Sequence, residues 1–306
     1  MPPPALPSSY TTLTLPHIRL AHHPPSSPTV TPIITIYLDR PTARNAFTTP
    51  MSNSLVTATN LLSADPRVRA IVLASSDPKN RSFCVGMDLA GSPGDADALS
   101  SGGRDDYRDP GGRTSLAFHR CDKPIIAAIN GDAVGVGATM TLPASIRVVS
   151  SAARLGFVFA RRGIVLEACS SFFLPRLIGA SRALHLVTTG GVYPATSPLF
   201  GDLFSEIVAP DQVVPRAFAI AEEVASKVSG VSAKLNREMI YRGGASPEEA
   251  HLLESALFYD LIKGKDSMEG MVSFMQKRDP VFEGTMGEDA PSIYPWWEEK
   301  DLKPKI

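Results

Sequence analysis

Short apolar runs alternate with amphipathic segments along the first two thirds of the chain. A short apolar run between turn residues predicts a buried strand, and apolar residues every three or four positions predict a helix. The expected strands are residues 33–38, 70–74, 125–129 and 146–150. The expected helices are residues 49–63, 115–121 and 135–142. The first of them begins with Thr49 as N-cap and Pro50 in the first turn. This alternation predicts an α/β fold.

The two ends of the chain differ from this middle part. Residues 1–32 contain many prolines and predict an extended or poorly ordered arm ahead of a core over 33–230. Residues 90–113 are rich in Gly, Ser and Asp without a period, which predicts a long loop. A helix over 214–228 closes the core. We expect residues 231–306 to form a helical region and tail, with two helices between 233 and 278.

Composition excludes several classes of protein. Of 306 residues, 43% are hydrophobic and 20% charged, which are globular values, and the net charge is −1. We therefore expect no nucleic-acid partner, and no apolar run reaches the roughly 18 residues of a membrane span. Three widely spaced cysteines and six scattered histidines predict neither a disulfide scaffold nor a metal site.

The two termini bear on localisation. Residues 1–9 lack the basic flank and apolar core of a signal peptide. The last three residues, Pro304, Lys305 and Ile306, loosely resemble the Ser-Lys-Leu peroxisomal address, although the first position departs from it. We expect a peroxisomal protein on this basis, and a cytoplasmic one if the tripeptide is not read.

Two glycine-containing turns are the remaining candidates for chemistry, because the common nucleotide, zinc-protease and serine-hydrolase motifs are absent from the sequence. Residues 83–89 read FCVGMDL and residues 130–137 read NGDAVGVG. Such turns are common for packing alone. Two backbone N–H groups from turns of this kind can also converge on one oxygen and stabilise developing negative charge, as in an oxyanion hole.

In these turns, and in Lys123-Pro124, IIAAI (125–129) and GIVLEACSSFFLPRLIG (163–179), the chain resembles the crotonase (enoyl-CoA hydratase/isomerase) superfamily over residues 10–284. The resemblance implies a spiral of ββα units, with a C-terminal helical region that builds trimers or hexamers. It also implies that the N–H groups of Met87 and Val136, after Gly86 and Gly135, bind the thioester oxygen of an acyl-CoA.

The resemblance also locates the acid/base residues. The two glutamates of the family's hydratases correspond to Thr139 and Phe159, and neither is a carboxylate. Some isomerases of the family place their carboxylate at the position of Glu167. A single base can carry a proton from C2 to C4 of a 3-enoyl thioester, whereas hydration must also activate a water. The apolar neighbours of Glu167 predict a desolvated carboxylate with a raised pKa.

The resemblance therefore predicts a Δ3-Δ2-enoyl-CoA isomerase that needs no cofactor, since CoA arrives with the substrate. An enoyl-CoA hydratase or dehydratase, of β-oxidation or secondary metabolism, and a non-catalytic acyl-CoA-binding protein are the alternatives. Asp132 is a rival carboxylate to Glu167. Gly86, Gly135, Phe159, Lys79 and Arg81 are the candidate substrate contacts besides these groups, the last two because CoA often passes this loop in the family.

Overall fold

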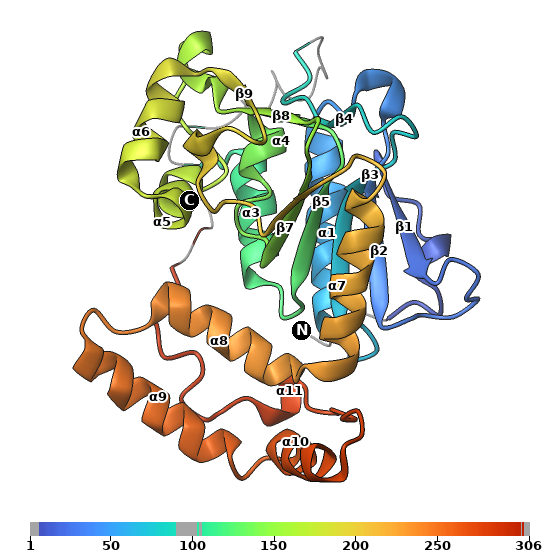
Figure 1. The fold of residues 1–306 in the computed structure, drawn as a ribbon, viewed down its shortest axis with the longest axis vertical. Coiled ribbons are helices and arrows are strands. Elements are labelled where there is room, and N and C mark those ends of the chain that lie inside the picture. The colour runs from blue at the N-terminus through green and yellow to red at the C-terminus, as the bar shows by residue number, and fades with distance from the viewer. Residues whose placement is uncertain (1–5, 90–102, 104–105, 301, 303–306) are drawn as a thin grey trace.

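The computed structural model describes residues 6–89, 103, 106–300 and 302. Within them the chain forms two β-sheets surrounded by helices (Figure 1). The first sheet has six strands in the order β1-β2-β3-β5-β7-β10, and the second has four in the order β4-β6-β8-β9. The strands are β1 (Ile18–His23), β2 (Ile33–Leu38), β3 (Ala70–Ser75), β4 (Ser82–Cys84), β5 (Ile125–Ile129), β6 (Asp132–Val134), β7 (Ile146–Ser150), β8 (Arg154–Gly156), β9 (Val192–Pro194) and β10 (Glu206–Val208).

The first sheet is parallel apart from its edge strand β1, which pairs antiparallel with β2. Its central strand β3 is buried at every position, which explains why its sequence is continuously apolar rather than alternating. Ile71 and Leu73 face one core cluster, and Val72 faces another. The sheet is therefore covered on both faces, as parallel sheets are.

Helices from different parts of the chain cover the two faces. Val213, Ala217 and Ala221 of α7 pack on one face, and α1 with α3 lies on the other (Figure 1). The helices of the core are α1 (Thr49–Ala64), α3 (Pro110–Arg120), α4 (Val136–Thr139), α5 (Ser170–Ile178), α6 (Ala180–Thr189) and α7 (Val213–Lys227).

The C-terminal region consists of α8 (Gly230–Arg242), α9 (Pro247–Leu261), α10 (Lys265–Gln276) and the short α11 (Met286–Asp289), at the lower end of Figure 1. A buried lysine of α8 anchors it: within the helix, Lys234 Nζ lies 2.8 Å from Glu238 Oε1, and both side chains are 2% exposed. Lys234 also donates to Arg120 O at 2.9 Å, at the C-terminal end of α3. The Lys234 hydrogen bond thus joins this region to the helix that borders the site described below.

The α/β class and the expected strands are confirmed. The arm predicted over 1–32 missed β1, because its polar and histidine residues lie on the half-exposed edge of the sheet. The prediction of two helices between 233 and 278 was wrong, since three lie there. The helix predicted to start at residue 115 starts at Pro110, with Asp109 as its N-cap. Most of the loop predicted over 90–113 lies outside the described residues.

Candidate active site

The two glycine-containing turns lie side by side because the strands before them are neighbours. β4 pairs in parallel with β6, with Cys84 opposite Ala133, so the segments that follow the two strands leave the sheet at the same end. Gly86 has φ +101° and Gly135 has φ +55°, backbone conformations that favour glycine. A Cβ added to Gly135 would lie only 3.9 Å from Gly86 Cα. The two turns therefore touch through their backbones.

The amide of Met87 is left free by its own strand contact. Phe47 forms a parallel bridge with Met87 by hydrogen bonding to the residues on either side of it: its N–H donates to Gly86 O at 2.8 Å, and its carbonyl accepts from Asp88 N at 2.9 Å. This pattern uses neither the N–H nor the carbonyl of Met87. Among the described residues no acceptor lies within hydrogen-bond distance of the Met87 N–H.

The amide of Val136 is free for a different reason. Val136 is the first residue of α4, where an N–H has no acceptor within the helix, and the described part of the chain supplies none from elsewhere. Gly135 N donates to Gly156 O at 2.8 Å, which fixes the turn against β8. Two unused main-chain donors thus follow two touching turns, as an oxyanion hole requires.

Buried side-chain hydrogen bonds hold the first turn in place. Asn45 is fully buried and donates from Nδ2 to Ser75 Oγ at 2.8 Å and to Phe83 O at 3.0 Å. Arg40 Nη1 lies 2.9 Å from Asp88 Oδ2. Such bonds within a low-dielectric interior resist displacement, so the Met87 amide is positioned before any ligand arrives.

Glu167 is half-buried in the loop before α5, where the next two residues, Ala168 and Cys169, have left-handed φ values of +54° and +56°. Thr139 of α4 donates from Oγ1 to Glu167 Oε1 at 2.5 Å. The other carboxylate oxygen, Oε2, lies against Gly111 of α3, where any Cβ would overlap it. Glycine at this position therefore leaves room for the carboxylate.

Burial raises the pKa of Glu167 to about 7, because desolvation penalises its charged form. The hydrogen bond from Thr139 acts in the opposite direction, and the negative charge of Asp109 adds a smaller increase. A carboxylate with a pKa near neutrality can both accept and return a proton efficiently.

The raised pKa and its cause, desolvation, agree with the prediction, but not all of the apolar neighbours in sequence contribute to it. Two of the apolar neighbours in sequence, Ile164 and Val165, are 58% and 84% exposed, because the loop turns them outward. Gly111 of α3 and Thr139 of α4 lie against the carboxylate. Asp109 was missed altogether. Its side chain accepts from Gly112 N at 2.5 Å and from Ala168 N at 3.3 Å, so it joins α3 to the Glu167 loop. The Asp-Pro pair, an N-cap followed by a first-turn proline, was the available signal.

The other predicted residues are dispersed. Phe159 is 6% exposed and belongs to the main core cluster. Lys79 and Arg81 are exposed on the loop before β4, and Arg81 lies 3.9 Å from Asp77. Asp132 accepts from Arg154 N at 2.9 Å and lies 3.7 Å from Arg44 Nη2, so the two described contacts of its side chain are with arginine residues away from Glu167. The structure therefore groups Glu167 with Thr139 and Asp109 rather than with Asp132.

No group of three His, Cys, Asp or Glu side chains among the described residues has an arrangement that could hold a metal ion. No helix within the same part of the chain combines the length and apolar character needed to cross a bilayer.

Comparisons with known proteins agree on one family. The family model for enoyl-CoA hydratase/isomerase matches residues 29–285. The enoyl-CoA hydratase AFT3-1 of Alternaria alternata is 48% identical over 259 residues, 84% of this chain and 85% of that protein. The (E)-benzylidenesuccinyl-CoA hydratase of Thauera aromatica is 30% identical over 250 residues, 81% and 94% of the two chains. A crystal structure of an enoyl-CoA hydratase from Bacillus anthracis matches with a TM-score of 0.75 at 26% identity, over 88% of this chain and 99% of that one.

Proposed function

The chain belongs to the enoyl-CoA hydratase/isomerase family and is an enzyme of that family, and from this premise we propose that it converts a 3-enoyl-CoA into the 2-enoyl-CoA. Glu167 is the proton carrier, and the N–H groups of Met87 and Val136 bind the thioester oxygen. Family membership at this identity with named enzymes sets aside a non-catalytic binding protein.

The proposed reaction has two proton transfers. Glu167 takes a proton from C2, and the electron pair of the broken C–H bond moves onto the thioester oxygen as a dienolate. The two amides stabilise this charge. Glu167 then returns the proton to C4, so that the double bond lies between C2 and C3. Atoms balance without water or oxidant, and this scheme requires no cofactor beyond the CoA of the substrate.

The observation that carries the proposal is that Glu167 alone, of the three positions compared with the family, is a carboxylate near the two turns. Thr139 uses its hydroxyl to bind Glu167, and Phe159 is a buried core residue. A single base suits proton transfer between two carbons of one substrate. Gly86 and Gly135 would contact the substrate as well, because they precede the Met87 and Val136 amides in the two touching turns.

The experiment is turnover of purified protein with 3-enoyl-CoA and, separately, 2-enoyl-CoA, analysed by chromatography and mass. The matched variants are Glu167→Gln, which keeps shape and removes the base, and Asp132→Asn. We expect a product of unchanged mass from 3-enoyl-CoA, lost about a thousandfold in the Glu167 variant and retained in the Asp132 variant. Equal activity of Glu167→Gln and the wild type would contradict the assignment.

Hydration of a 2-enoyl-CoA is the second candidate. Its support is that relatives 48% and 30% identical are named hydratases, and that Asp109 supplies a second carboxylate next to Glu167. Asp109 already accepts two main-chain N–H groups, which leaves it less suited to hold a water. A product heavier by one water from 2-enoyl-CoA would establish this reaction in place of isomerisation.

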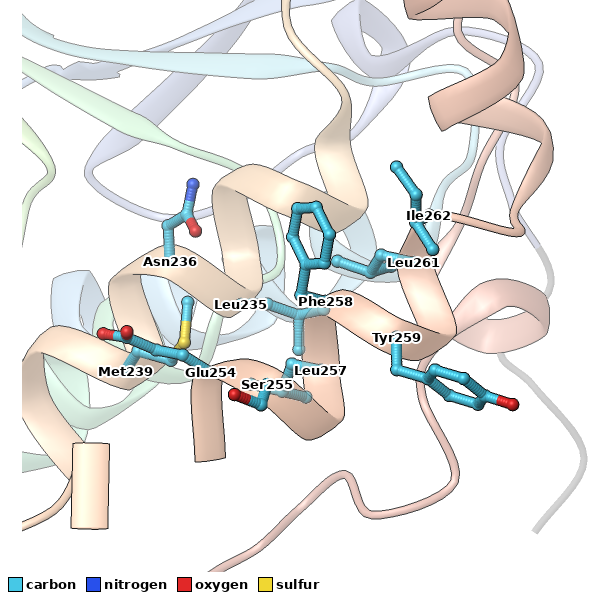
Figure 2. A pocket seen from close by; sticks show the side chains of 10 residues that line it. All are labelled: Leu235, Asn236, Met239, Glu254, Ser255, Leu257, Phe258, Tyr259, Leu261 and Ile262. Carbon is cyan, nitrogen blue, oxygen red and sulfur yellow. The ribbon is translucent and has the colours of Figure 1, made fainter. Parts of the chain in front are cut away.

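A homotrimer or hexamer is proposed from the C-terminal helices. Phe274, Ile240 and Leu252 are 85%, 81% and 71% exposed in the single chain. Figure 2 shows a pocket between α8 and α9 with Leu235, Phe258, Leu261 and Ile262 among its lining residues. Apolar surface of this extent is typical of a subunit interface.

We propose a peroxisomal location from the C-terminal Pro304, Lys305 and Ile306, which lie outside the described residues. Fluorescent fusions test it. A fusion that leaves Ile306 as the free C-terminus should concentrate in peroxisomes, and one that masks Ile306 should stay in the cytoplasm. A diffuse unmasked fusion would exclude the peroxisomal address.

A further inference from the structure

The Thr139 hydroxyl lies between the carboxylate and one of the two amides. Its oxygen is 2.5 Å from Glu167 Oε1 and 3.3 Å from Gly135 O, and the residue is fully buried. A hydroxyl has one hydrogen, so it donates fully to one of these acceptors at a time. The shorter distance indicates that the Thr139 hydroxyl hydrogen points toward Glu167 Oε1.

Gly135 O and the Val136 N–H belong to the same peptide unit. A hydrogen bond accepted by the carbonyl of a peptide polarises the unit and strengthens its N–H as a donor. The carbonyl already accepts from Ala138 N at 2.9 Å and from Thr139 N at 3.0 Å. Those two bonds are fixed by α4, so the hydroxyl hydrogen is the variable contact.

We propose that Thr139 is a positioning residue that couples the proton on Glu167 to the strength of the Val136 amide; the inference rests on the function proposed above. While Glu167 is ionised, the hydroxyl donates to Oε1 and orients the base. When Glu167 holds the substrate proton its charge is gone, and either oxygen becomes a weaker acceptor. The hydroxyl hydrogen then turns to Gly135 O. Val136 becomes a stronger donor at the moment when the thioester oxygen carries negative charge.

The other titratable groups around Glu167 are not free to change their hydrogen bonds when Glu167 takes up a proton. The titratable groups that interact with Glu167 are Asp109 before α3, Cys84 of β4 and Cys169 of its own loop. Burial raises the pKa of both thiols, so they stay neutral at the working pH. Asp109 is held by Gly112 N and Ala168 N. The Thr139 hydroxyl is therefore the mobile donor.

Two variants and a spectroscopic probe test the coupling. Thr139→Val keeps the shape and removes the hydroxyl, and Thr139→Ser restores a hydroxyl. Hexanoyl-CoA labelled with ¹³C at the thioester carbonyl is bound to each protein, and its carbonyl band is recorded by infrared spectroscopy at pH 5.5 and 8.5, on either side of the Glu167 titration. We expect a larger shift to low frequency at the acidic pH in the wild type and the serine variant than in the valine variant. The direct effect of the Glu167 charge is common to all three and cancels in the comparison.

Kinetics give the second readout. Thr139→Val should lower kcat about 10- to 100-fold with KM changed less than about threefold, since a hydrogen bond to a charged group is lost. The acidic limb of the pH profile should move to higher pH. The serine variant should restore both.

The two hypotheses fail separately. If the wild type turns over 3-enoyl-CoA and the carbonyl band responds to pH equally in wild type and Thr139→Val, the coupling is wrong and the isomerase stands. If the wild type converts neither enoyl-CoA, or does not bind hexanoyl-CoA, the proposed function fails and the mechanistic meaning of the coupling fails with it.

Discussion

The two glycine-containing turns and the C-terminal helices differ in how far their side chains are buried within the chain. Around the turns, Asn45 and Thr139 are fully buried and make their hydrogen bonds within one chain, and the Gly86 and Gly135 backbones touch. In the C-terminal region, side chains such as Phe274 and Met275 are 85% and 73% exposed. The groups of the proposed chemistry therefore make their contacts within one chain, whereas the helical region leaves apolar side chains exposed that the proposed oligomer would cover.

The largest effect is expected where the two regions are joined. Lys234→Ala leaves Glu238 buried with one fewer cation and removes the donor to Arg120 O. The free energy of unfolding should fall by about 3 kcal/mol, measured by urea titration. Lys300→Ala, in an exposed pair, is the control and should change it by less than about 0.5 kcal/mol. A loss below about 1 kcal/mol for Lys234→Ala would mean that this lysine does not hold α8 against the end of α3.

The next effect concerns the first turn. Gly86→Ala forces a side chain into φ +101° with its Cβ 3.1 Å from Val134 O, which displaces the Met87 amide. We expect kcat to fall about 100-fold, measured by turnover. Gly179→Ala has φ +81° but open space around it, so it should cost stability without this loss of kcat. An unchanged kcat in the Gly86 variant would contradict the assignment of the Met87 amide to the oxyanion hole.

The pH dependence of stability isolates Glu167. Its pKa is raised from 4.5 to about 7 in the folded chain, so its contribution to stability is full below pH 4.5 and is lost as pH rises through 7. Glu167→Gln should therefore be more stable than the wild type by about 2 kcal/mol at pH 8.5, and about equal at pH 5. Thermal or urea unfolding at both pH values measures this. Glu223→Gln, the same substitution on the exposed surface of α7, is the control. An equal stability difference from wild type at both pH values for Glu167→Gln would refute the desolvated base.

The smallest effect on the single chain is expected in the helical region. Phe274→Asp places a charge on the exposed face of α10 and should change the stability of one subunit by less than about 0.5 kcal/mol. It should nevertheless dissociate the proposed oligomer, as measured by light scattering after gel filtration. Gln276→Asp introduces the same charge on the same helix and should leave the assembly intact. A wild type that is already monomeric would disprove the interface.

The sequence alone determined the strands over 33–38, 125–129 and 146–150 and the two glycine turns, because these features depend on local apolar runs and on backbone conformations that favour glycine. It also identified the family, through motifs whose residues are close in sequence. It could not reveal β4, β6, β8 and β9, since strands of three residues have no readable period.

Only the tertiary structure grouped Glu167 with Thr139, Asp109 and Gly111. These residues come from α3, α4 and the loops before α3 and α5, separated by up to 58 positions (109 to 167). Their contacts depend on how α3 packs beside α4, which no local pattern encodes. The sequence therefore named the carboxylate, and the packing of distant segments decided how it is buried, oriented and linked to the amide.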